Sequence, residues 1–137
     1  FLYLVRNYKL MSMKTKLTMT IIGVIMILQS IAYPLFSETF IDMMFNVGAE
    51  AKSVLNLFQI AVAPTFFMIG LLMLMARGAE LKTSKNLLLA FIIGYIPAFL
   101  GFYNLASSPL TNAGISDFAP DIIMFALAVF TYIKPKS

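Results

Sequence analysis

Very few residues in this sequence are able to do chemistry. The chain of 137 residues contains no cysteine and no histidine. Disulfides, thiolate metal sites, haem held by His or Cys, and the usual near-neutral proton carrier are therefore excluded. The sequence shows no nucleophile–base pair, no carboxylate pair and no phosphate-binding glycine loop. We predict no catalytic residue, no metal and no cofactor, and we do not expect an enzyme.

Polar side chains inside the apolar segments are the remaining candidates for a site. An unpartnered amide costs several kcal/mol in lipid, so these groups should face one another or water. Our hypothesis is a ligand pocket that opens outward, and the alternative is a set of interhelical hydrogen bonds that only hold the helices together. Tyr95 lies apart from this set, and its hydroxyl is expected to find a backbone carbonyl. The residues of the hypothetical pocket are Gln29, Tyr33, Asn56, Gln59, Tyr103 and Asp121.

The composition predicts that lipid is the solvent around these groups. Hydrophobic residues make up 61% of the chain and charged residues only 12%, whereas a soluble domain is about half apolar and a quarter charged. The net charge is +4, and the basic residues are scattered among apolar segments. We interpret them as signals of membrane topology and not as a surface that binds nucleic acid. The length allows one compact domain.

Four apolar segments are long enough, or nearly so, to cross a bilayer as helices, and they form a single domain over residues 17–137. Residues 1–16 form a basic N-terminal segment, in which Met11 or Met13 is the expected natural start. The fourth segment is short, at about 24 Å, and needs local thinning or help from its flanks. The predicted spans are residues 17–36, 54–76, 86–105 and 118–133.

The charges alternate between the connections, and this predicts the orientation. Nine of the ten basic residues fall on one side of a four-helix topology, with only Lys52 opposite, while five of the six acids fall on the side of Lys52. Basic loops stay in the cytoplasm. We therefore expect an inner-membrane, multi-pass protein with both termini cytoplasmic and with residues 37–53 and 106–117 outside.

The two outer connections carry helix signals. Ser37 is a candidate N-cap with Glu38 in the first turn, and Gly48 is a candidate end, so we predict a short interfacial helix over the outer mouth of the bundle. The alternative is an irregular loop. Before the fourth span, Asp117 is a candidate cap, and Pro120 and Asp121 suit a first turn.

The third span carries small residues at helical spacing. They let helices approach closely, and we predict a packing seam within the chain, with a homo-oligomer interface as the alternative. Pro64 and Pro97, inside the second and third spans, should kink their helices. The seam consists of Ala90, Gly94, Ala98 and Gly101.

The layout over residues 17–133 resembles the small four-helix bacterial membrane proteins grouped as DoxX-like. The likeness lies in the first span "TIIGVIMILQSIAYPLF", the outer stretch "FNVGAEAKSVLNLF" and the second span "IAVAPTFFMIGLLMLMAR" followed by a basic hairpin. The resemblance implies a four-helix membrane bundle. DoxX itself is associated with quinone-linked thiosulfate oxidation, but the basic and glycine-bearing positions of better-defined members are not evident here. No catalytic residue is carried over.

Three roles follow as expectations. The first is an accessory or interaction subunit with a membrane protein partner. The second is a binder or carrier of a hydrophobic small molecule, a quinone or a lipid, in the outer pocket. The third is a small exporter, which the lack of charged groups near the midplane of the spans disfavours.

Overall fold

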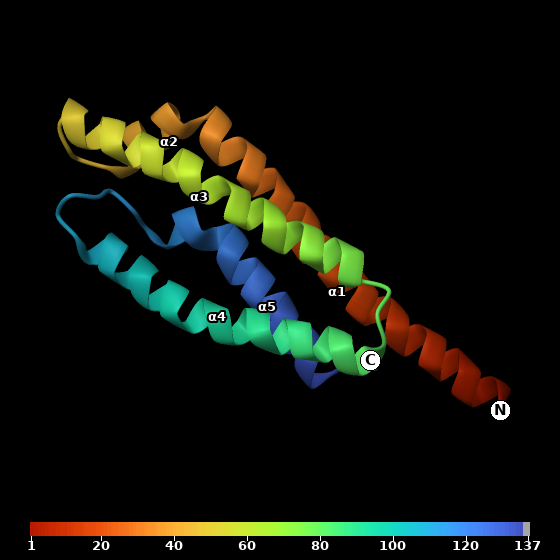
Figure 1. Cartoon of the computed structure of the whole chain (residues 1–137). Coiled ribbons are helices and arrows are strands. Elements are labelled where there is room, and N and C mark those ends of the chain that lie inside the picture. The colour runs from red at the N-terminus through yellow and green to blue at the C-terminus, as the bar shows by residue number, and fades with distance from the viewer. Residues whose placement is uncertain (136–137) are drawn as a thin grey trace.

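The structure, a computed structural model, describes residues 1–135, without the side chains of residues 3–13. The chain is an all-α bundle, as predicted, and within the described residues four helices are long and apolar enough to cross a membrane (Figure 1). Each predicted span falls almost wholly within one of them. The elements are α1 (Leu2–Leu35), α2 (Ser37–Met44), α3 (Ala49–Ala76), α4 (Leu81–Ser107), η1 (Ile115–Phe118) and α5 (Ala119–Ile133).

The helices pack as two antiparallel pairs, α1 with α3 and α4 with α5, and α1 joins the pairs by packing on α5 and α4 (Figure 1). Helix α1 also projects beyond the rest of the bundle at its N-terminal end. The core lies between α1, α4 and α5, with one residue from α3. It consists of Met19, Ile22, Met26, Met73, Leu88, Phe91, Tyr95, Met124 and Ala128.

Glycines permit the closest helix contact, which is between α1 and α3. A Cβ built on Gly70 would lie 2.8 Å from the carbonyl oxygen of Gly23, and a Cβ built on Gly23 would lie 2.9 Å from the carbonyl oxygen of Gly70. No side chain fits between these two backbones. The close crossing of α1 and α3 therefore depends on both glycines, as small residues do at helix interfaces in membranes.

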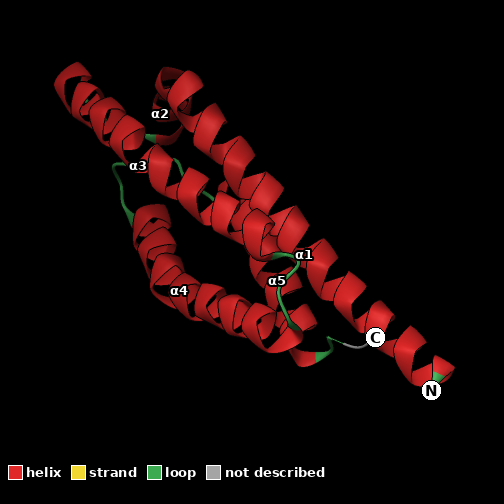
Figure 2. Ribbon diagram, turned by 45° about the vertical axis from the view of Figure 1, so that its right-hand side comes forward, coloured by secondary structure: helices red, strands yellow, loops and turns green. Residues whose placement is uncertain are grey.

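Proline does not interrupt the long helices. Pro64 lies inside α3 and Pro97 inside α4, and both helices continue past them. Helix α4 is bowed, as Figure 2 shows.

The short fourth span is completed by η1. Helix α5 has 15 residues, and together with the 3₁₀ turn before it the span covers 19 residues, Ile115–Ile133. The 3₁₀ turn rises by about 2.0 Å per residue and the α-helix by about 1.5 Å, so the span reaches about 30 Å. The expected contribution from a flank is thus present on the N-terminal side.

The two long connections hold each other at one end of the bundle, which we call the α2 end. The backbone N–H of Asn46 donates to the carbonyl of Leu110, and that of Asn112 donates to the carbonyl of Met44, both at 2.7 Å. The side-chain amides of Asn46 and Asn112 also bond to each other. These contacts join the α1–α3 pair to the α4–α5 pair. The pattern of the amino-acid sequence did not predict them.

Three predicted helix signals are corrected. The N-cap of α2 is Phe36, because Ser37 is already helical and its hydroxyl bonds across to α3. Gly48 caps the start of α3, while α2 ends four residues earlier at Met44. Asp117 does not cap α5; its carboxylate accepts from the N–H of Gly114, 2.7 Å away, and so closes the 3₁₀ turn. Glu38 and Asp121 lie in the first turns of α2 and α5, as predicted.

Charge is divided between the two ends of the bundle. We call the end opposite the α2 end the basic end. There Lys14 meets the C-terminus of α5: its ammonium donates to the carbonyl of Lys134 at 2.8 Å and lies over the Phe130 ring. Lys85 lies over Tyr132 at the same end. The side chains of Arg6 and Lys9, and all of Lys136, lie outside the described residues.

Candidate functional site

The structure divides the predicted site residues among separate places. Gln29 and Tyr33 lie together on α1, where the Gln29 amide donates to the Tyr33 hydroxyl at 3.1 Å. Gln59 is half-buried on α3 and makes no side-chain hydrogen bond within the described part of the chain. Tyr103 is 72% exposed on α4. The sequence analysis grouped these residues because they lie at a similar depth in the predicted spans. The structure places them on different faces of their helices.

Asp121 is buried and bonded to a partner that we did not predict. Its carboxylate accepts a hydrogen bond of 2.9 Å from the hydroxyl of Tyr95, which replaces the expected bond of Tyr95 to a backbone carbonyl. The Tyr95 ring lies among Phe91, Phe99 and Phe125. A carboxyl group in this surrounding requires its donor, since a buried polar group without one is costly.

Gln29 carries a buried oxygen that no hydrogen bond within the described residues accounts for. Gln29 is 7% exposed, and its Oε1 has no hydrogen-bond partner in the described part of the chain. The Gln29–Tyr33 bond lies within α1, whereas the Tyr95–Asp121 bond joins α4 to α5.

A second set of buried polar groups lies toward the basic end, and sequence reasoning missed it. The hydroxyls of Thr18 and Thr131 are 2.6 Å apart and buried, and Ser84 is also buried. Threonine at these positions inside apolar spans was the available signal. The bond links α1 to α5 and accounts for both hydroxyls.

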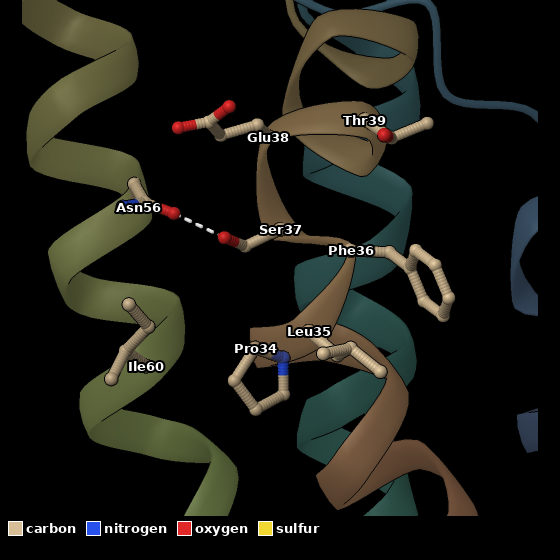
Figure 3. Close-up of a pocket in the computed structure, with 8 residues that line it drawn as sticks. All are labelled: Pro34, Leu35, Phe36, Ser37, Glu38, Thr39, Asn56 and Ile60. Atoms are coloured by element: carbon tan, nitrogen blue, oxygen red, sulfur yellow. Dashed lines mark hydrogen bonds between the residues drawn. The ribbon is translucent and has the colours of Figure 1, made fainter.

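A surface crevice lies between α2 and α3 at the α2 end, and of the predicted residues it contains Asn56 (Figure 3). The Ser37 hydroxyl donates to Oδ1 of Asn56 across it. In Figure 3 the Glu38 side chain is directed toward α3, whereas Phe36 and Thr39 point away from it. The crevice has a volume of about 340 Å³ and is lined by Pro34, Leu35, Phe36, Ser37, Glu38, Thr39, Asn56 and Ile60.

A second hollow of about 230 Å³ adjoins the crevice and shares Glu38 and Asn56 with it. An ion pair spans this part, with the Lys52 ammonium 2.8 Å from the Asp42 carboxylate. Along α3 the lining runs from Ala49 at the tip to Ile60, which is about 16 Å at 1.5 Å per residue. We call the two hollows together the α2–α3 crevice.

The α2–α3 crevice mixes polar and apolar groups along its length. Ile41 and Ala49 line the tip beside Asp42 and Lys52, and Pro34 and Ile60 line the other hollow together with Ser37 and Asn56. Glu38 has no ionic partner among the described residues, since Lys52 is bonded to Asp42. The crevice therefore presents one unpaired acid among polar and apolar side chains.

The small-residue face of α4 is open at three of its four residues, whereas Ala98 packs against the core. A Cβ built on Gly94 or on Gly101 would meet nothing within 4 Å, and Ala90 is exposed. Helix α4 packs on α5 and, to a lesser extent, on α1. The predicted seam thus makes no close helix contact at its glycines within this chain.

The fold and these surfaces define the class: a small multi-pass membrane protein built as a four-helix bundle, in a lipid bilayer environment. Comparisons of the chain with models of protein families, with curated proteins and with solved structures found no match. The resemblance to DoxX-like proteins therefore stays a resemblance of layout.

Proposed function

We propose that this protein binds an amphiphilic small molecule of the lipid class in the α2–α3 crevice. The observation that carries the proposal is a crevice at the end of the spans in which Glu38, an acid without an ionic partner among the described residues, shares the lining with the apolar residues Pro34 and Ile60. Small-molecule sites in proteins are concave, with volumes of about 300–1,000 Å³ and a few placed polar groups. A crevice at the end of the spans is also reachable from the bilayer without opening the core.

The charge distribution supports an orientation for this site. We propose that the basic end faces the cytoplasm, so that the crevice lies in the outer leaflet of the inner membrane. Short loops rich in Lys and Arg remain cytoplasmic, and Arg77, Lys82 and Lys85 all belong to the α3–α4 turn or the start of α4. Labelling of a cysteine introduced at Ala79 from the outside would contradict this orientation.

Filling the apolar part of the crevice should remove binding. Ile60 lines the crevice and is 46% exposed, so Ile60→Trp adds bulk there with little effect on the core. We expect retained lipid, measured by native mass spectrometry from mild detergent, to fall about tenfold, which corresponds to about 1.4 kcal/mol of binding free energy.

The matched control is Leu57→Trp, which adds a tryptophan one turn away on α3 at a residue that is 70% exposed and does not line the crevice. It should bind lipid as the unchanged chain does. Equal retention by the Ile60→Trp variant would mean that the lipid sits elsewhere.

A second candidate is the accessory or interaction subunit expected from the sequence. The observation that favours it is the part of α4 where a Cβ built on Gly94 or on Gly101 would meet no other element within 4 Å. Another membrane helix could approach closely there. We expect a stoichiometric partner, or a second copy, to co-purify in mild detergent and to be lost in Gly94→Leu but not in Ala61→Leu, a change on an exposed position of α3.

A further inference from the structure

We propose that the α2–α3 crevice is selective for phospholipids whose headgroup ends in a primary ammonium, and that Glu38 is the residue that selects them. This inference rests on the proposed function and adds the chemical class of the ligand. It begins from the charges of the crevice. Its lining carries two carboxylates, Glu38 and Asp42, and one ammonium, Lys52.

The one ammonium of the lining, that of Lys52, is already paired. Lys52 bonds to Asp42 at 2.8 Å, so that pair is internally neutral. Glu38 is left with a full negative charge and an exposed side chain directed across the crevice toward α3 (Figure 3). A cationic group complements that charge, whereas an anionic headgroup would be repelled by it.

Hydrogen-bonding capacity distinguishes a primary ammonium from a quaternary one. A primary ammonium carries three N–H donors. Acceptor oxygens with free lone pairs lie around the crevice on Glu38, on the Ser37 hydroxyl and on Oδ1 of Asn56, since the Ser37–Asn56 bond uses only part of their capacity. These three groups come from two helices and face the same space.

The placement of the aromatic residue in the lining disfavours a quaternary ammonium. Choline-type headgroups have no N–H and are recognised by faces of aromatic rings. Phe36 is the one aromatic residue in the crevice lining, and it points away from α3 (Figure 3). A choline headgroup would therefore donate no hydrogen bond to Glu38 or to the remaining lone pairs of Ser37 and Asn56.

The apolar part of the crevice decides between a lipid and a soluble amine. Pro34, Leu35 and Ile60 supply the apolar part of the crevice lining next to Ser37 and Asn56. A soluble amine would use only the polar groups. An acyl chain attached to the headgroup would cover this apolar surface, so the occupant is a phospholipid.

The test uses the full chain in mild detergent with an equimolar mixture of phosphatidylethanolamine, phosphatidylcholine and phosphatidylglycerol that share the same acyl chains. Native mass spectrometry counts which lipid is retained. We expect phosphatidylethanolamine to be retained about tenfold more than either of the other two lipids. One charge-assisted hydrogen bond can account for a change in affinity of about this size. Glu38→Gln should abolish this preference.

Glu50→Gln is the control. Glu50 is an exposed acid in the first turn of α3 that does not line the crevice, so this variant should keep the preference. Stepwise N-methylation of the ethanolamine headgroup should weaken retention at each step, because each methyl removes one N–H. Free ethanolamine should compete only weakly.

Each other outcome overturns the selectivity. Equal retention of the three lipids, with binding still lost in Ile60→Trp, would end this inference and leave the proposed function standing. A preference that survives Glu38→Gln would show that Glu38 does not select the headgroup. No lipid in the crevice at all would end both proposals, and competition by free ethanolamine at equal strength would show a soluble amine as the occupant.

Discussion

Gly70→Ala should destabilise the bundle, even though alanine is the better helix former. The added Cβ meets the carbonyl oxygen of Gly23 and Cγ1 of Ile27 at 2.8 Å, and the backbone nitrogen of Ile27 at 3.1 Å. Two of these atoms belong to the backbone of α1, so α1 and α3 must move apart. Overpacking of this kind costs about 1–3 kcal/mol. The free energy of unfolding in detergent, from titration with a denaturing detergent, measures the loss.

Gly94→Ala is the matched control for that result. It is the same substitution in a membrane-spanning helix, but nothing lies within 4 Å of the added Cβ. Alanine is favoured over glycine within a helix by about 1 kcal/mol in water. We therefore expect no loss, or a small gain, in the purified single chain. If the two variants lost the same stability, the α1–α3 crossing would not be as close as the structure shows.

Tyr95→Phe should cost about 1–2 kcal/mol of bundle stability, within the range found when a buried hydrogen-bond partner is removed. Tyr95 is 8% exposed and Asp121 is 7% exposed, so water cannot replace the lost donor without entering the core. Asp121→Ala should cost a similar amount, because it leaves the tyrosine hydroxyl without its acceptor.

A double-mutant cycle identifies the bond as the cause. The combined variant should lose less than the sum of the single losses, with a coupling energy of about 1 kcal/mol, since the second change finds the bond already gone. Tyr103→Phe is the control, because Tyr103 is 72% exposed on the same helix. Additive losses for Tyr95→Phe and Asp121→Ala would contradict the bond.

The Asp121→Ala variant also tests the exporter alternative. That alternative requires this variant to lose substrate flux in proteoliposomes.

Much of the candidate site was visible in the sequence as a set of polar residues, but not as partners. Gln29 and Tyr33 are four residues apart on one helix, so their contact follows from helical spacing. The bonds Tyr95–Asp121 and Ser37–Asn56 join different helices. Which turns of two helices lie level with each other depends on how the helices pack, and the positions of polar residues along the chain do not specify that packing.

The amino-acid sequence by itself determined the class of fold, the number of spans and the division of charge, because these depend on hydrophobic length and on which connection carries each charge. Only the tertiary structure decided where the helices come close. Sequence spacing favoured the small residues of α4, yet the tight crossing is at Gly23 and Gly70. The physical reason is that a small residue permits close approach but does not require it; the neighbouring helix must present a matching gap at the same level.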